Sequence, residues 1–322
     1  MSDALVGGLD LGGTKLLGVV VDPVGSEPLL LEERLATPAG HELVGGALVE
    51  LAGRLVERAS QELGREVRAF GVGAPGLVDR AGVLRYGPNL PGVVDLDVVS
   101  LLGSQLGVAV TAENDATCAA WGEHERGASR GRNHSVMVTL GTGIGAGITV
   151  KGELLRGAHG FAGELGHMVV DPTGALCPCG RRGCWERYAS GSGLGLLARE
   201  AANAGQAGQV VALAGGDPED VRGEHVTEAA LAGDPAALEV LGRFGWWVAL
   251  GLANIVNILD SEIVVVGGGL VAAGPLVMDP TRAAFGQLVL ASDHRPEVPL
   301  VQAQLGEQAG AIGAALLAAA RT

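Results

Sequence analysis

The stretch LVGGLDLGGTKLLGVVVD (residues 5–22) decides the fold class, because a Gly-rich turn separates two apolar runs. Residues 5–10 and 16–22 have the composition of strands, and the glycines between them predict a tight turn. The same arrangement returns later as VMVTLGTGIGAGITV, with strand segments at 136–140 and 148–150. A strand, a Gly/Thr turn and a second strand in both halves indicate an internal duplication.

Strands and helices alternate along the rest of the chain, which is typical of an α/β fold. Further strands are predicted at residues 29–36, 67–73, 107–112 and 262–266. Helices are predicted at residues 41–63, ended by Gly64, from Asn114 or Asp115 to about Gly127, at 234–259 and at 308–320. This order predicts two similar α/β lobes with Gly turns facing a shared cleft: a small lobe of residues 1–112 plus 308–322, and a large lobe of residues 113–307.

Charge and composition exclude several kinds of protein. The 322 residues carry a net charge of −14 and contain no run of Lys or Arg that would form a basic face, so nucleic-acid binding is not expected. The N-terminus lacks the basic and apolar regions of a secretion signal, and the longest apolar stretch, 246–259, is shorter than the roughly 18 residues of a membrane span. We therefore expect a cytoplasmic protein with no membrane partner and with 246–259 in a buried helix.

Glycine is unusually frequent, at 54 of 322 residues, which is more than twice the usual share of about 7%. The glycines lie between Val, Ile and Leu runs, which favours tight turns and close backbone approaches over disorder. A coding bias toward Gly and Ala is the alternative explanation for part of the excess.

Both Gly-rich turns have the chemistry of a phosphate site. A phosphate chain needs several converging backbone N–H groups, so Cβ atoms must be absent, and a nearby hydroxyl or ammonium adds hydrogen bonds. Asp10 is predicted to be a Mg²⁺ partner through water, because a carboxylate beside phosphate is repulsive without a metal. Neither turn fits a P-loop or a dinucleotide motif. The predicted phosphate-binding residues are Asp10, Gly12, Gly13, Thr14, Lys15, Gly141, Thr142, Gly143, Gly267, Gly268 and Gly269.

The cysteines predict a metal site. Cys177, Cys179 and Cys184 form a C-x-C-x₄-C pattern, and with His167 ten residues upstream they make a Cys₃His set suited to tetrahedral zinc. Disulfides are a poor alternative in a chain without a secretion signal, and three free thiols are the other alternative. Four protein ligands close the coordination sphere, so the predicted Zn²⁺ is structural.

Seven segments of the chain resemble the ROK family of sugar kinases and repressors. They occur in the expected order, and the resemblance runs from about residue 5 to residue 317. It implies the actin-like (ribonuclease H-like) ATPase fold, with two duplicated lobes and a central cleft. The segments are LDLGGTK (9–15), GVGAPGLVD (71–79), ENDA (113–116), TLGTGIGAG (139–147), GFAGELGH (160–167), CPCGRRGCWE (177–186) and VVGGG (265–269).

The resemblance implies transfer of the γ-phosphoryl group of Mg-ATP to the 6-hydroxyl of a hexose after the lobes close on the sugar. Asp115 matches the catalytic base of the family, which has only to orient the attacking hydroxyl and accept its proton. Taken alone, an aspartate at this position is more often a helix cap than a base. The residues implied to bind the sugar are Asn89, Asn114, Asp115, Glu164, His167 and Glu186.

The acceptor and the donor are less sharply predicted. Glucose is the expected hexose, but fructose, N-acetylmannosamine and N-acetylglucosamine stay open, and so does polyphosphate in place of ATP. Val93 stands where many family members have an aromatic residue, and no function is predicted for residues 191–224. A repressor is not expected because the first strand begins near residue 5, and a non-catalytic sugar sensor is not expected because Asp115 is present. The family suggests a dimer or tetramer.

Overall fold

The computed structural model describes residues 4–27 and 29–321, which fall into two compact units. Unit 1 consists of Met1–Met137, Ala146–Gly163 and Ala303–Thr322. Unit 2 consists of Val138–Gly145 and Glu164–Gln302. These bounds differ from the two predicted lobes, because the helix that begins at Asp115 packs with the C-terminal helix inside unit 1. The division into lobes at residue 113 stays a prediction.

Two five-stranded sheets share one strand order. The first sheet has the order β3-β2-β1-β4-β8 and the second β11-β10-β9-β12-β13, so each runs third, second, first, fourth and fifth in chain order. In the first sheet β1, β2 and β3 pair antiparallel, while β4 is parallel to β1 and to β8. The shared order confirms the duplication that the two Gly turns predict. The strands are β1 (Leu5–Leu11), β2 (Lys15–Val21), β3 (Leu31–Ala36), β4 (Val67–Ala74), β8 (Ala109–Asn114), β9 (Ser135–Leu140), β10 (Ile144–Val150), β11 (Glu153–Leu154), β12 (Ile263–Gly267) and β13 (Leu300–Gln302).

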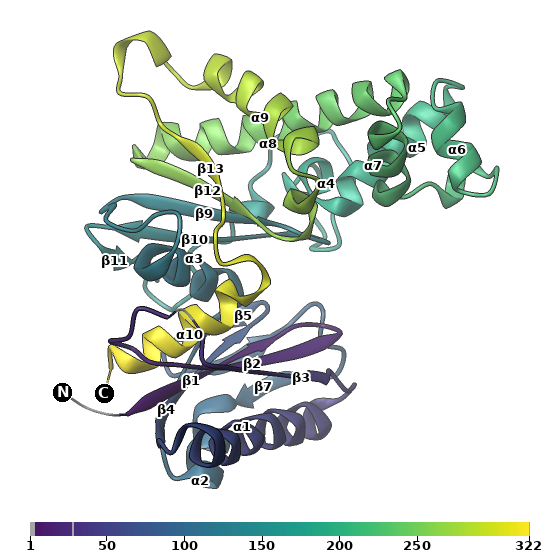
Figure 1. Cartoon of the computed structure of the whole chain (residues 1–322). Helices are drawn as coiled ribbons and strands as arrows, with labels where there is room; N and C mark the ends of the chain where they lie inside the picture. Colours follow the sequence, from purple (N-terminus) through teal and green to yellow (C-terminus); the bar gives the residue numbers. More distant parts are fainter. Residues whose placement is uncertain (1–3, 28, 322) are drawn as a thin grey trace. The chain divides into compact units, whose positions relative to one another are not determined.

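Helices α1 (His41–Leu63) and α10 (Ala309–Ala319) cover opposite faces of the first sheet (Figure 1). Side chains alternate along β1, so Leu9 packs with the leucines of α1 while Val6 packs with Ala311 of α10. Helix α1 ends as predicted, since Gly64 takes the left-handed conformation with φ 63°.

Glycine allows α10 to reach the backbone of the sheet. A Cβ atom on Gly8 would lie 1.9 Å from the carbonyl oxygen of Ala311, and one on Gly71 would lie 1.8 Å from that of Ala314. Neither distance is possible for a real side chain. At these two positions the glycines therefore serve the close backbone approaches expected from the composition.

The second Gly-rich turn is shorter than predicted. Only residues 141–143 form the turn, and β10 already begins at Ile144. Gly147 lies within this strand. Glycine is needed there because a Cβ atom would be 2.4 Å from the Cβ of Ala120 on α3 (Asp115–Arg126). Glycines that look like turn residues in the sequence thus serve strand-to-helix packing.

The remaining elements complete the two units. A small sheet in unit 1 consists of β5 (Leu77–Val78), β6 (Val83–Tyr86) and β7 (Val94–Asp97), and α2 spans Val98–Leu106. The helices of unit 2 are α4 (Glu186–Ala189), α5 (Gly191–Asn203), α6 (Gly208–Leu213), α7 (Gly223–Leu231), α8 (Pro235–Leu259) and α9 (Pro275–Leu288). Short 3-10 helices lie at Leu165–His167, Pro218–Asp220, Gly269–Ala273, Ser292–His294 and Gly306–Gln308.

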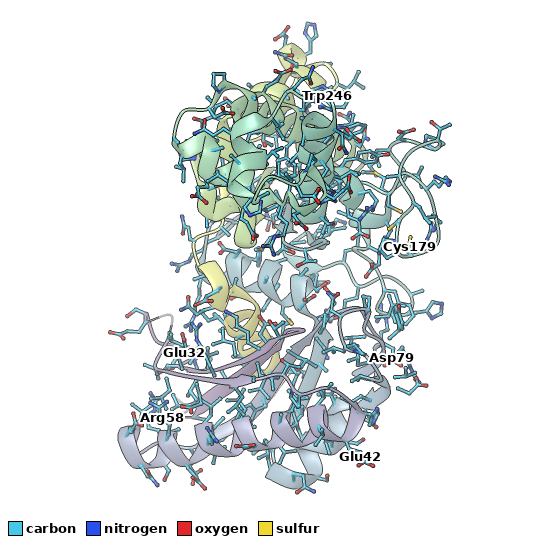
Figure 2. All side chains as sticks on the ribbon, turned by 90° about the vertical axis from the view of Figure 1, so that its right-hand side faces the viewer. Glu32, Glu42, Arg58, Asp79, Cys179 and Trp246 are labelled. Atoms are coloured by element: carbon cyan, nitrogen blue, oxygen red, sulfur yellow. The ribbon has the colours of Figure 1, made fainter. Side chains whose placement is uncertain are left out.

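Helix α8 is a core helix of unit 2. By length and composition it meets the criteria for a membrane span, but 56% of its most apolar window is buried within the structure, which is typical of a packed helix. Trp247 stacks on Tyr188 with ring centroids 4.3 Å apart, whereas Trp246 is half-exposed (Figure 2). The predicted buried helix is therefore confirmed.

Candidate active site and metal centre

Asn114, and not Asp115, caps helix α3. The Oδ1 atom of Asn114 accepts a hydrogen bond of 3.0 Å from the backbone N–H of Thr117, and its Nδ2 donates to the carbonyl oxygen of Gly76 at 3.2 Å. The Asp115 carboxylate accepts the N–H of Ala116 at 2.8 Å and also a hydrogen bond from the side chain of Asn114. Of the two candidates for the cap, the structure therefore selects Asn114. The Asp115 carboxylate can still accept hydrogen bonds from a substrate.

Asp10 and Asp115 lie near one another in unit 1. Burial, followed by the negative charge of Asp115, raises the pKa of Asp10 to about 7, against the opposing effect of Lys15. Burial also raises the pKa of Asp115. Two carboxylates that resist ionisation together are a favourable place for a cation.

Asp10 is expected to make stability depend on pH when no divalent cation is present. Its pKa in the folded chain lies above the unfolded value, so its favourable contribution is complete below about pH 4 and is lost as pH rises through about 7. Asp10→Asn should therefore raise the Tm above pH 7 by roughly 2–4 °C, and the gain should vanish near pH 4. Thermal unfolding in EDTA across this range measures the effect.

Asp79→Asn is the matched control for that experiment. The pKa of Asp79 is lowered, because hydrogen bonds from the Val83 N–H and from Arg85 outweigh the effect of burial. Its substitution should lower the Tm above about pH 4, which is the opposite sign. Equal Tm shifts for both variants would show that ionised Asp10 does not destabilise the folded chain.

The first Gly-rich turn is held in a defined conformation. The N–H of Gly12 donates to the carbonyl oxygen of Lys15 at 2.9 Å, and the hydroxyl of Thr37 donates to the carbonyl oxygen of Gly12 at 2.7 Å. Asn89 lies beside it, since a Cβ on Gly13 would be 3.0 Å from the Asn89 carbonyl oxygen. The structure thus brings the predicted sugar residue Asn89 and the predicted phosphate turn together within unit 1.

Lys15 is paired with a residue that the sequence does not single out. Its Nζ lies 2.7 Å from Oε2 of Glu307, and the same carboxylate also pairs with Arg34. The hydrogen bonds from Arg34 and then Lys15 lower the pKa of Glu307 to about 2. No local signal could reveal this contact, because 292 residues separate Lys15 from Glu307.

Glu113 and Arg156 form an ion pair beside Asn114 and Asp115. Glu113 is buried, and Arg156 begins the segment that leads to Glu164. A buried carboxylate is stable only with such a partner. The pair therefore ties the end of β8, directly before Asp115, to the segment at residues 156–163, all within unit 1.

Unit 2 contains a cavity of about 1130 Å³, a volume suited to a nucleotide. Gly141 and Thr142 of the second Gly-rich turn lie on its wall, as does Gly269 after β12. The turn is fastened to the start of α5, since Ser192 donates to the carbonyl oxygen of Thr142 at 3.0 Å. The lining residues are Gly141, Thr142, Arg187, Gly191, Ser192, Gly195, Arg199, Arg222, Gly223, Glu224, Thr227, Glu228, Leu231, Gly269, Leu270, Ala272 and Ala273.

The other predicted glycines of unit 2 lie beside this cavity without lining it. Gly267 ends β12, and Gly268 has φ 87°, with a Cβ position only 2.4 Å from the Leu140 carbonyl oxygen. Gly143 approaches the carboxylate of Glu186, because a Cβ there would lie 2.9 Å from Oε2. At Gly268 and Gly143 the missing Cβ lets the turns pack closely.

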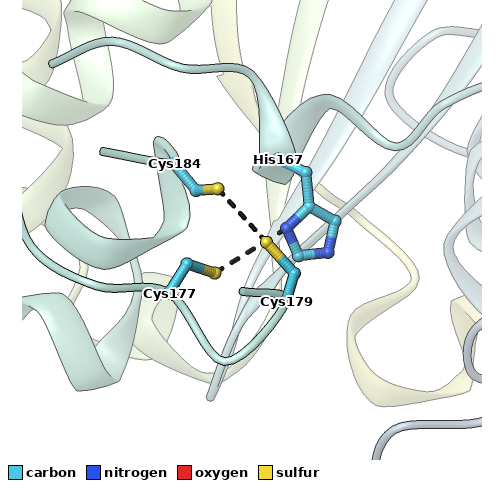
Figure 3. A group of neighbouring side chains, drawn as sticks. All are labelled: His167, Cys177, Cys179 and Cys184. Carbon is cyan, nitrogen blue, oxygen red and sulfur yellow. Dashed lines mark hydrogen bonds between the residues drawn. The ribbon is translucent and has the colours of Figure 1, made fainter. Parts of the chain in front are cut away.

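Three cysteines and His167 point toward one another in unit 2 (Figure 3). Their ligand atoms all lie within 4.8 Å of each other, with Cys179 Sγ 3.5 Å from Cys184 Sγ and His167 Nδ1 3.9 Å from Cys177 Sγ. Ligands on a tetrahedral zinc ion lie about 3.5–3.8 Å apart, given the usual Zn–S and Zn–N lengths. The four residues therefore fit zinc.

The protonation of the thiols agrees with a metal site. Burial raises the pKa of Cys177 and of Cys184, so without a cation both remain thiols. A zinc ion would displace their protons, since the thiolate is the ligand. Cys179 lies on an exposed loop (Figure 2), and its sulfur completes the cluster from the solvent side.

His167 is oriented for two contacts. Its Nδ1 faces Cys177, whereas its Nε2 lies 3.9 Å from Oε2 of Glu164. Oε1 of Glu186 lies 3.5 Å from Nδ1 and 3.0 Å from the sulfur of Cys177. The predicted sugar residues of unit 2 thus gather at the cysteine cluster, and the imidazole can bind a metal on one side and a hydroxyl on the other.

Comparison with known proteins identifies the family. The ROK family model matches residues 6–321. The chain belongs to the ROK family. The predicted membership is therefore confirmed.

Two relatives of this ROK chain are bacterial glucokinases. The glucokinase of Streptomyces coelicolor is 38% identical over 314 residues, which are 97% of this chain and 96% of that protein. The glucokinase of Thermotoga maritima is 35% identical over 309 residues, 96% of this chain and 95% of that protein. A crystal structure of a ROK family glucokinase from Streptomyces griseus in complex with glucose and AMPPNP has a TM-score of 0.84 and 37% identity, covering 98% of this chain and 100% of that one. This likeness confirms the actin-like ATPase fold.

One segment for which the sequence predicts no function lies on the wall of the unit 2 cavity. Residues 191–224 supply much of the cavity wall, including Ser192, Arg199 and Arg222. A signal was present at Ser190, which caps α5 ahead of the glycines at 191 and 193. This helix start lies on the cavity wall, where the N–H of Gly191 holds the second Gly-rich turn through the carbonyl oxygen of Gly141.

Proposed function

We propose that this ROK protein is an ATP-dependent glucokinase, which transfers the γ-phosphoryl group of ATP to the 6-hydroxyl of glucose. The observation that carries the proposal is the Asp115 carboxylate, which is not consumed by capping α3 and lies close enough to Asp10 to raise its pKa. Glucokinases that are 35–38% identical over nearly the whole chain support glucose as the acceptor.

Asp115 acts as the base in the proposed reaction. Its carboxylate orients the 6-hydroxyl and accepts its proton as the oxygen attacks phosphorus, while the bond to the bridging oxygen of ATP breaks and ADP leaves. The raised pKa makes the carboxylate a better proton acceptor than an ordinary aspartate. Lys15 must exchange Glu307 for a phosphate oxygen if it is to contribute its positive charge.

We assign sugar recognition to side chains that include both hydrogen-bond donors and hydrogen-bond acceptors. Asn89, Glu164, His167 and Glu186 offer donors and acceptors to the ring hydroxyls. Asn114 is assigned to the sugar as well, and its side chain also hydrogen-bonds Gly76 and Asp115. A site built from such polar partners strongly rejects a sugar that lacks the matching hydroxyl.

The cavity of unit 2 is the proposed site of the nucleotide, with the backbone of Gly141 and Thr142 against its phosphates. Asp10 would hold Mg²⁺ through water, and the ion when bound neutralises the phosphate charge. Zn²⁺ would be held by His167, Cys177, Cys179 and Cys184, where it fixes the loop and the imidazole. That role is structural, since four protein ligands leave no open position.

A coupled ADP-release assay with a panel of acceptors tests the proposal. Glucose should give the highest kcat/KM among glucose, fructose, N-acetylmannosamine and N-acetylglucosamine, with ATP as donor. Polyphosphate in place of ATP tests the donor in the same assay. Absence of turnover with all four sugars would refute the kinase, and preference for another hexose would move the assignment to that sugar.

Location and assembly belong to the same proposal. We place the enzyme in the cytoplasm and expect a dimer or tetramer. Light scattering coupled to gel filtration gives the oligomeric mass directly, and a mass equal to one chain would contradict that expectation.

A further inference from the structure

We propose that Arg187 binds the donor phosphates, so that its guanidinium supplies positive charge to the phosphate chain of the nucleotide in the unit 2 cavity. The inference rests on the proposed function, because it requires a nucleotide donor. It assigns a donor-binding role to a residue outside every motif noted above.

Arg187 is placed on the cavity wall by firmly packed neighbours. Two residues before it, Trp185 is fully buried and its Nε1 donates to the carbonyl oxygen of Trp247 at 2.7 Å. The next residue, Tyr188, stacks on Trp247. The backbone of α4 is thereby anchored on both sides of Arg187, and Arg187 lines the cavity together with Thr142.

The guanidinium of Arg187 is unsatisfied. Its Nε is buried and has no hydrogen-bond partner, and no carboxylate in the described part of the chain pairs with it. The other two arginines of the cavity are engaged: Arg199 donates to the carbonyl oxygen of Val221 at 2.8 Å, and Arg222 lies 3.2 Å from Glu224. A buried donor without an acceptor is costly, and a ligand that supplies the acceptor relieves that cost.

Phosphate is the ligand chemistry that this arginine fits best. A guanidinium presents five N–H donors in a planar fork that matches two oxygens of one phosphate group. The second Gly-rich turn lies on the same cavity wall, with Gly141 held to α5 by a 2.7 Å hydrogen bond from the N–H of Gly191. The turn itself offers neutral N–H groups, so Arg187 would add a positive charge on this wall of the cavity.

Isothermal titration of the full-length chain separates phosphate binding from binding of the nucleoside. We expect Arg187→Met to weaken Mg-ADP binding at least about tenfold and adenosine binding by less than about twofold, while Arg187→Lys retains most of the Mg-ADP affinity. Arg243→Met is the matched control. It removes the same charge from an exposed pair with Glu200 in the same unit, so its affinities should equal those of the wild type.

Two results would overturn the inference. Unchanged Mg-ADP affinity in Arg187→Met would show that the guanidinium does not bind phosphate, and equal losses for Mg-ADP and adenosine would show that Arg187 only shapes the cavity. If Arg187→Met does not fold by circular dichroism, Arg187→Gln carries the same comparison with a polar side chain. Failure of the wild type itself to bind Mg-ADP would instead refute the proposed kinase.

Discussion

Asp115→Asn is expected to lower kcat by about 10²–10⁴, while KM for glucose and for Mg-ATP changes by less than about threefold. An amide keeps the size of the side chain and can still contact the hydroxyl, but it cannot accept the proton. The loss should therefore fall on the chemical step. Steady-state kinetics by coupled ADP release measure both constants, and a pre-steady-state burst would show whether chemistry limits turnover.

Asp97→Asn is the matched control for this prediction. Asp97 caps α2 in the same unit by accepting the N–H of Ser100 at 2.9 Å, so its substitution changes a cap and leaves the reaction alone. We expect a small loss of stability and a normal kcat. If Asp115→Asn behaved like Asp97→Asn, with a lower Tm and near-normal turnover, Asp115 would be a structural residue and the base would lie elsewhere.

Loss of zinc is expected to raise the KM for glucose at least about tenfold and to lower the Tm by about 5 °C or more. The metal would hold His167 and the loop at residues 177–184 in place, and Glu186 contacts the same cluster. Without it, the residues assigned to the sugar lose their common anchor. The side chain of Cys184 is fully buried, and Cys184→Ser removes this one ligand with little change in size.

Metal analysis of each variant makes the zinc experiment decisive. Wild type should contain about one zinc per chain, and Cys184→Ser should contain much less. Cys118→Ala serves as control, because this buried cysteine lies in unit 1, away from the cluster, and should leave the zinc content unchanged. A zinc-free preparation with full activity would defeat the structural role.

Some features of the site can be predicted from the sequence because they depend on residues that are close together in the chain. The spacing of Cys177, Cys179 and Cys184 already implies a shared ligand, and the structure brings the three sulfurs together with His167. The strand, turn and strand of residues 5–22 follow from alternation and from glycines at a bend. The sequence also predicts a turn at Gly147, which lies in β10, because packing against Ala120 cannot be read from a window of sequence.

Other features depend on contacts between distant residues. Either Asn114 or Asp115 could begin α3, and only the hydrogen bond to Thr117 shows that Asn114 is the cap. The pairing of Lys15 with Glu307 is equally invisible in the sequence.

By itself the sequence determined the alternation of strands and helices, the duplicated Gly turns, the Cys₃His set and the family, because each is written in short runs of residues with their own periodicity or spacing. Only the tertiary structure decided that Asp115 is relieved of capping, that Asp10 is held at a raised pKa, and that Arg187 lines a cavity without a partner. The physical reason is that hydrogen-bond satisfaction, burial and charge coupling are sums over neighbours in space. Those neighbours come from segments that the chain keeps far apart until it folds.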